Sequence, residues 1–222
     1  MNLPDLAVQS GYARVAWAVV LATLVMWALT SATARFRRTG APARIGAIVL
    51  SLALMFLPGE WSPAYWLGLV FHLPSLMLVA LCLVRMCLRR ADLNASPALT
   101  PRLSWLVVLG GALLYADTFG VLSLQIYALG FDPWMAPIAA LGLGAWAFYR
   151  LRHAMAPGWG LALLISVLGY CLLRLPSGNL FDAVLDPILW IAALWSVLRD
   201  LLHRLRASAG ARPTAAAATR DV

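Results

Sequence analysis

Long apolar runs alternate with short polar stretches along this 222-residue chain. Seven runs approach the roughly 20 residues that an α-helix needs to cross the hydrocarbon core of a bilayer. Several are shorter, so we expect their ends to extend into flanking polar residues or the bilayer to thin locally. The seven predicted helices are Val15–Ala34, Ile45–Leu57, Tyr65–Met86, Leu103–Tyr115, Pro133–Tyr149, Gly158–Leu173 and Ala183–Leu198.

The composition agrees with this pattern. The chain is 63% hydrophobic and only 12% charged, whereas soluble domains carry about 25% charged residues. The sequence therefore predicts an all-α, polytopic integral membrane protein with about seven transmembrane helices. All 17 basic residues are arginines, and with the abundant alanine this favours a GC-rich bacterial source.

The arginines predict an orientation. If the N-terminus lies outside, only Arg14 and Arg174 of the 17 basic residues fall in outer segments. This asymmetry is the positive-inside rule, and it predicts a bacterial inner (plasma) membrane protein with a cytoplasmic C-terminus. The arginines that give the net charge of +8 are then expected to face anionic lipid headgroups, so no nucleic-acid partner is expected.

The two ends of the chain need separate interpretation. Ala32-Thr33-Ala34 has the small residues of a signal-peptide cleavage site, but Arg35, Arg37 and Arg38 follow it instead of preceding it. We therefore predict a retained first helix. Residues 1–206 form a single transmembrane domain in this interpretation, and residues 207–222 form a disordered cytoplasmic tail.

The segment Phe119–Phe131 is apolar but has only 13 residues. At 1.5 Å per residue it would cover roughly 20 Å of a 30 Å core. Counting it as another span would place Arg150 and Arg152 outside. Three alternatives stay open: an outer-face helix, a re-entrant segment, or an extension of the fourth span.

A weak internal repeat is present. Val49-Leu50-Ser51, Val108-Leu109-Gly110 and Val167-Leu168-Gly169 recur at a spacing of 59 residues. Each triplet begins a predicted helix that runs outward. The next helix along the chain is apolar, is predicted to run back across the membrane, and ends in arginine. This spacing favours one lead helix followed by three hairpins.

Several rare polar residues gather in the predicted outer segments. Asp132-Pro133 and Asp186-Pro187 each resemble a helix N-cap followed by an N1 proline. Asp182 and Asp186 are four apart, so a short helix would place both on one face. The candidate binding residues of this outer cluster are Asp117, Arg174, Asn179, Asp182 and Asp186.

The aromatic residues Trp61, Trp66, Phe119, Trp134 and Phe181 lie in the same outer segments. One interpretation is a pocket for a sugar, an amine or a lipid headgroup; the other is a solvated rim with an interfacial aromatic belt. Arg174 is the unusual base, and we expect it either to neutralise Asp117, Asp182 or Asp186 or to extend to the headgroups.

Two intramembrane features are notable. His72 lies in the predicted third span before Pro74 and Ser75, and it is a candidate proton relay or a helix–helix contact. Ala136, Ala140 and Gly144 form a small-residue stripe typical of close helix packing, and Gly110-Gly111 has the same potential.

Several classes of protein are excluded. A retinal Schiff base needs lysine, which the chain lacks. The three histidines and the apolar-segment cysteines Cys82, Cys87 and Cys171 form no recognisable haem, metal or disulfide pattern, so we expect no cofactor and no metal. No nucleotide-binding or hydrolase motif appears in a credible context, and no catalytic residue can be assigned.

Three hypotheses about function remain. The first is a non-enzymatic subunit or scaffold of an envelope-assembly or secretion system, which interacts with the bilayer and with a membrane-protein partner or a second copy. The second is a small transporter or channel, for which internal repeats are typical. The third is an intramembrane hydrolase or transferase with Asp117 or Asp182 as base and Arg174 as anion ligand.

Overall fold

The computed structural model describes residues 4–32, 41–87 and 100–210, and every regular element in these ranges is a helix. The predicted all-α class is therefore confirmed for the described part of the chain. The elements are α1 (Leu6–Ala32), α2 (Ala41–Met55), η2 (Gly59–Trp61), α3 (Pro63–Phe71), α4 (Leu76–Cys87), α6 (Pro101–Thr118), α7 (Ile126–Leu129), α8 (Met135–Arg152), α9 (Pro157–Leu173), α10 (Leu180–Val184) and α11 (Pro187–Gly210).

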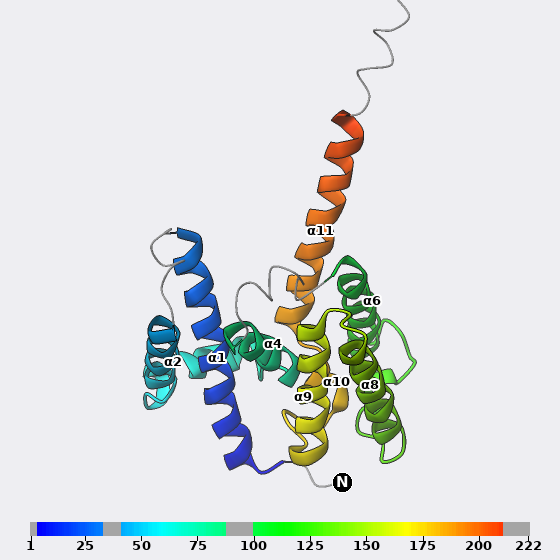
Figure 1. The fold of residues 1–222 in the computed structure, drawn as a ribbon. Coiled ribbons are helices and arrows are strands. Elements are labelled where there is room, and N and C mark those ends of the chain that lie inside the picture. The colour runs from blue at the N-terminus through cyan, green and yellow to red at the C-terminus, as the bar shows by residue number, and fades with distance from the viewer. Residues whose placement is uncertain (1–3, 33–40, 88–99, 211–222) are drawn as a thin grey trace, which may run out of the picture.

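Five of the helices pack side by side in a row, and α6 and α11 form a separate pair. The row runs α2, α1, α4, α9, α8, and the short α10 lies against α9 and α4. Helix α6 packs along α11. In Figure 1, α1 begins at the lower end of the molecule, while α11 rises past the other helices at the upper end.

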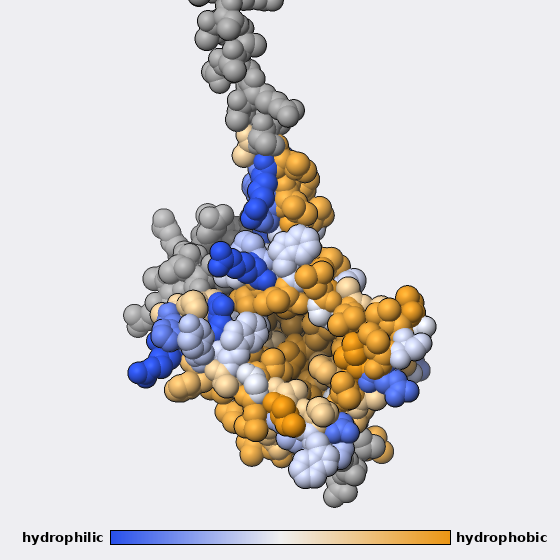
Figure 2. Space-filling view, turned by 90° about the vertical axis from the view of Figure 1, so that its right-hand side faces the viewer, coloured by the Kyte–Doolittle hydropathy of each residue, from blue (hydrophilic) through white to orange (hydrophobic). Residues whose placement is uncertain are grey.

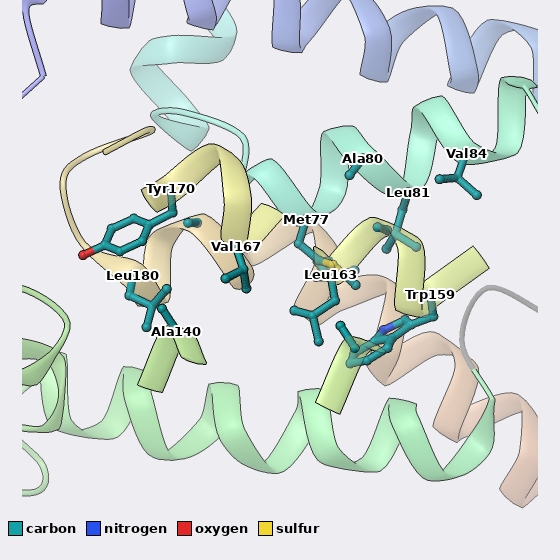
Figure 3. Packing of buried hydrophobic residues seen from close by; sticks show 14 of the residues in the cluster. Met77, Ala80, Leu81, Val84, Ala140, Trp159, Leu163, Val167, Tyr170 and Leu180 are labelled. Carbon is teal, nitrogen blue, oxygen red and sulfur yellow. The ribbon is translucent and has the colours of Figure 1, made fainter. Parts of the chain in front are cut away.

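The main core lies where α4, α8 and α9 meet. Figure 3 shows Met77 of α4 next to Leu163 of α9, and Ala140 of α8 on the opposite side of α9. Ala136, Ala140 and Ala147 are almost fully buried, which fits a small-residue face against α9. At this interface a Cβ on Gly160 would lie 3.1 Å from the carbonyl oxygen of Ala147, so the two backbones approach closely.

A second core lies between α1 and the helices α2, α3 and α4. Ala16, Trp17 and Val20 of α1 are buried against α2, α3 and α4, with Met55 among them. Because about a third of its most apolar stretch is buried, α1 is an integral part of this packing.

Two of the predicted helices have wrong bounds: one is divided in two, and the other begins later than expected. Tyr65–Met86 is two helices, α3 and α4, because Pro74 lacks an N–H and disfavours the helical conformation before it. At the break His72 adopts φ 60°. The predicted Ala183–Leu198 helix instead begins at Pro187, since Leu185 is extended between α10 and α11.

Other boundaries also differ from expectation. Phe119–Phe131 contains only the four-residue α7, and α6 ends at Thr118, so this segment does not extend the fourth predicted span. The outer-face and re-entrant alternatives stay predictions. Helix α11 continues to Gly210, so residues 207–210 are helical, whereas we had predicted a disordered tail; residues 211–222 lie outside the described ranges. The most extensive helix pairs are α8 with α9, α1 with α2, α4 with α9 and α6 with α11. None of them joins the two helices of a predicted hairpin, and the duplication stays a prediction.

Among the described residues, one helical stretch, Leu6–Leu29, is long and apolar enough to cross a membrane by length and composition. Such a helix near the N-terminus fits either a membrane span or a signal sequence. Three shorter apolar helices are Ile45–Met55, Leu76–Cys87 and Pro157–Leu173.

Candidate functional site

The outer polar cluster forms where two loops meet, one after α6 and one between α9 and α11. The amide N–H of Leu180 donates to the carbonyl oxygen of Gly130 over 3.1 Å. The side-chain amide of Asn179 donates to the carbonyl oxygen of Tyr127 over 3.0 Å. Glycine is required at 130, because a Cβ there would overlap the amide oxygen of Asn179. The loops therefore form one unit.

Asn179 is the fully buried centre of this unit. Its side-chain oxygen accepts from the N–H of Phe181 at 2.8 Å and so caps α10. Its own N–H donates to the hydroxyl of Ser177. All of these bonds are made within the chain, so this candidate residue fixes the loop conformation.

Asp182 accepts two hydroxyl hydrogen bonds. One comes from Tyr127 over 2.8 Å and the other from Ser177. Burial raises the pKa of Tyr127, and the hydrogen bond to Asp182 and the charge of that carboxylate raise it further. The tyrosine therefore remains a donor at neutral pH.

Asp117 is joined to Asp182 through the same tyrosine. Its carboxylate accepts the N–H groups of Leu124 and Tyr127, each over 3.0 Å. These backbone donors, that of Tyr127 first, hold the pKa of Asp117 below its ordinary value. Tyr127 thus binds one aspartate through its backbone and the other through its ring hydroxyl.

Arg174 forms no ion pair with these acids or with Asp186, so the expectation that it neutralises Asp117, Asp182 or Asp186 is wrong. It ends α9 in the left-handed conformation with φ 56°. Its Nη1 donates to the hydroxyl oxygen of Tyr170 over 2.8 Å, and its guanidinium lies 5.2 Å from the centre of that ring. Within the ranges that the structure describes, the one ion pair joins Arg204 and Asp200.

Asp186 serves a separate junction. It is only 5% exposed, and its Oδ1 accepts the N–H of Leu189 over 2.7 Å, as an N-cap of α11 does. Its Oδ2 accepts the N–H of Ser75 over 2.8 Å, at the start of α4. One buried carboxylate therefore holds two helix N-termini, where the helix dipoles favour a negative charge.

The proposed pairing of Asp182 with Asp186 on one helix face is also wrong. Helix α10 ends at Val184, and the extended Leu185 separates it from α11. The predicted cap at Asp132-Pro133 is shifted. Asp132 accepts the N–H groups of Trp134 and Met135 at 2.8 Å, but α8 begins at Met135 with Trp134 as its N-cap, so Pro133 is not its first residue. These donors, that of Met135 first, lower the pKa of Asp132.

His72 lies at the end of α3, where the predicted span is broken. Its N–H donates to the carbonyl oxygen of Gly68 over 3.1 Å, and its side chain is exposed. The relay role of His72 stays a prediction. In the described ranges, no three His, Cys, Asp or Glu side chains are placed to hold a metal ion.

Of the five aromatic residues predicted to lie in the outer segments, Phe181 lies in the cluster, where its N–H donates to Asn179, and the other four are exposed. Trp61, Phe119 and Trp134 are 82%, 80% and 77% exposed. Trp66 is also exposed, and its ring nitrogen donates to the carbonyl oxygen of Glu60. This distribution favours the aromatic-belt interpretation over a binding pocket.

Sequence reasoning missed the tyrosines that connect the polar groups. Tyr127 and Tyr170 organise the loop unit, and the hydroxyl of Tyr12 donates to the carbonyl oxygen of Pro74 over 2.7 Å at the helix break. Tyr12 and Pro74 are 62 residues apart in sequence, and Tyr127 and Asp182 are 55 apart. The one available signal was that these hydroxyl-bearing rings stand in otherwise apolar stretches.

Comparison of the chain with protein-family models, with curated proteins and with solved structures finds no match.

Proposed function

We propose that this chain is a polytopic bacterial inner-membrane protein and a non-enzymatic subunit or scaffold of an envelope-assembly or secretion system. Its N-terminus lies outside and its C-terminus in the cytoplasm. The observation that carries the structural role is the use of the outer acids. Asp117, Asp182 and Asp186 each accept two hydrogen bonds from the chain's own loops and helix ends.

The apolar surface supports the membrane part of the proposal. Large side chains stand on the outer sides of α6, α8 and α9, among them Leu109 at 61%, Leu141 at 75% and Leu172 at 79% exposed. Figure 2 shows a hollowed face that is mostly apolar. Apolar surface of this extent marks contact with lipid or with another protein.

Helix lengths agree with a thin or adapted bilayer. Helices α6 and α8 have 18 residues each and α9 has 17. At 1.5 Å per residue they are about 27 Å long, close to a hydrocarbon core of about 30 Å. Polar or snorkelling residues at their ends would complete the crossing.

The packing of α1 supports a retained helix. A signal peptide is removed, so the mature fold does not need it. Here Trp17 is 2% exposed, and the Tyr12 hydroxyl binds the break between α3 and α4. Removal of α1 would delete both side chains and expose the residues of α2, α3 and α4 that pack against it.

The transporter alternative has one observation in its favour. Broken helices are typical of transporter sites, where the N-terminus of a half-helix faces an anionic group. The N-terminus of α4 follows such a break, and it is already bound to Asp186. This intramolecular ligand favours the structural role.

Purification in mild detergent from the native cell tests the proposal. The tagged chain would be isolated, its complex mass determined, and co-purifying proteins identified. We expect a stoichiometric membrane partner in addition to any second copy of the chain, and the partner should be retained by the variants Asp117→Asn and Arg174→Gln. Recovery of the chain without any partner protein, together with substrate uptake or turnover abolished by Arg174→Gln, would contradict the scaffold role.

A further inference from the structure

Helix α11 has an apolar stripe that continues past the other helices. Figures 1 and 2 show the upper half of α11 projecting from the molecule, with one side apolar and the other side polar. The stripe is formed by five large side chains that are 42–64% exposed: Ile191, Trp195, Leu198, Leu202 and Leu205.

The spacing of these residues is that of a helix-pairing seam. They follow one another at intervals of four, three, four and three residues, a period of 3.5. This heptad spacing keeps one narrow face toward a partner helix. The opposite face holds Leu189, Ala193 and Val197, which are at most 6% exposed and lie on the side of α11 that packs into the molecule. The seam therefore points away from the body.

Lipid does not explain the upper part of the seam. A helix surrounded by lipid is apolar on all sides. After Leu198, the other sides of α11 carry Arg199, Asp200, His203, Arg204 and Arg206. The pair Arg204–Asp200, at 2.9 Å, stabilises the helix on its polar side. Leu202 thus continues the seam at a level where the helix has become amphipathic.

The residues beside the seam favour parallel pairing of two copies of α11 over antiparallel pairing. In the heptad register, Arg199 and Arg206 occupy e positions, and Leu194 and Leu201 occupy g positions. Between two parallel copies an e position faces a g position of the partner, so each arginine would lie beside a leucine. Between antiparallel copies the e positions face each other, and arginine would oppose arginine. Parallel pairing is also the orientation of two copies inserted the same way in one membrane.

We propose that α11 pairs in parallel with α11 of a second copy of this chain along the seam. The inference rests on the proposed membrane insertion, because two heptads are fewer than the three or four that a free coiled coil needs. Confinement of both copies to one membrane raises their effective concentration and compensates for the short seam. The chain is then a homodimer whose two-fold axis lies along the membrane normal.

Disulfide cross-linking in native membranes tests this pairing. In a background with Cys82→Ala, Cys87→Ser and Cys171→Ser, single cysteines are introduced as Leu198→Cys and Leu202→Cys. His203→Cys, one residue along but on the polar side, is the matched control. Two differently tagged copies are co-expressed, and mild oxidation is followed by tag-specific detection.

We expect linked species that contain both tags at the two seam positions, at least tenfold more than at His203→Cys. Equal linkage at all three positions, linkage to a different protein, or no linkage because the seam is covered by lipid would overturn the pairing. Alkaline carbonate extraction of the same membranes reports on insertion independently. A chain that resists extraction but does not cross-link contradicts the dimer alone, whereas an extracted chain contradicts the membrane proposal.

Discussion

At the scale of single residues, the rare polar groups of this chain hold the ends of helices. Asp186 binds the first N–H groups of both α4 and α11, and Asp132 binds those at the start of α8. Helix N-termini leave four N–H groups without partners inside the helix. A few aspartates therefore fix the geometry of an otherwise apolar fold.

The double role of Asp186 predicts an unusually large effect of its removal. Asp186→Ala leaves two buried N–H groups without an acceptor, and each such group costs about 1–3 kcal/mol. We expect the free energy of unfolding in detergent to fall by roughly 2–4 kcal/mol, measured by denaturant titration. Asp5→Ala, which removes an exposed acceptor at the start of α1, is the control and should cost less than about 1 kcal/mol. Equal effects of the two substitutions would contradict the junction.

The bond between Tyr127 and Asp182 predicts an energetic coupling. Hydrogen bonds to charged groups contribute about 1.5–3 kcal/mol. A double-mutant cycle of Tyr127→Phe and Asp182→Asn should therefore give a coupling energy above about 1 kcal/mol. The pair Tyr65→Phe and Asp182→Asn, which has no such bond, should be additive. Additivity in both cycles would show that the loops are held by other contacts.

Only part of this hydrogen-bond network could be predicted from the sequence. Asp-Pro pairs have a local meaning, so the cap at Asp186-Pro187 could be predicted from the sequence, as could hydrogen bonds from Asp132 near the start of α8. The second partner of Asp186 could not, since Ser75 is 111 residues away and carries no signal of its own. Arg174 was misassigned for a related reason: charge alone favours an acid as its partner, but the left-handed end of α9 places its guanidinium over Tyr170.

At the scale of elements, helix positions followed the apolar pattern closely, and turns and breaks did not. The predicted Gly158–Leu173 differs from α9 by one residue. The predicted helix Tyr65–Met86 did not include the break between α3 and α4 at His72. Hydropathy is the same on both sides of the break, so the local backbone preference of proline decided the structure.

Helix packing gives a matched pair of glycines for a test. A Cβ on Gly111 would overlap the ring of Trp190, whose ring nitrogen donates to the carbonyl oxygen of Val108 over 3.0 Å. A Cβ on Gly110 meets nothing within 4 Å. Gly111→Ala should therefore destabilise the protein by about 1–3 kcal/mol, as judged by thermal unfolding in detergent. Gly110→Ala should be neutral or stabilising by up to about 1 kcal/mol. The reverse order would contradict the packing of α6 on α11.

At the scale of the whole molecule, the sequence predicts an orientation, which stays a prediction, but it does not indicate which helices are neighbours. Arginine positions and apolar lengths are properties of the linear chain, so they support a topology directly. Contacts such as α4 with α9 depend on side-chain shape, and apolar runs of similar composition do not specify them. The small-residue stripe at Ala136 and Ala140 indicated a close helix contact, but it did not identify α9 as the partner.

The most direct measurement of the central claim is cysteine accessibility in intact cells. In the cysteine-free background, single cysteines replace Glu60 and Asp132 at the predicted outer face, and Arg152 and Arg206 at the predicted cytoplasmic face. A membrane-impermeant maleimide should label the first two positions in intact cells and the last two only after permeabilisation. Labelling of all four positions in intact cells, or of none before permeabilisation, would contradict a polytopic protein with its N-terminus outside.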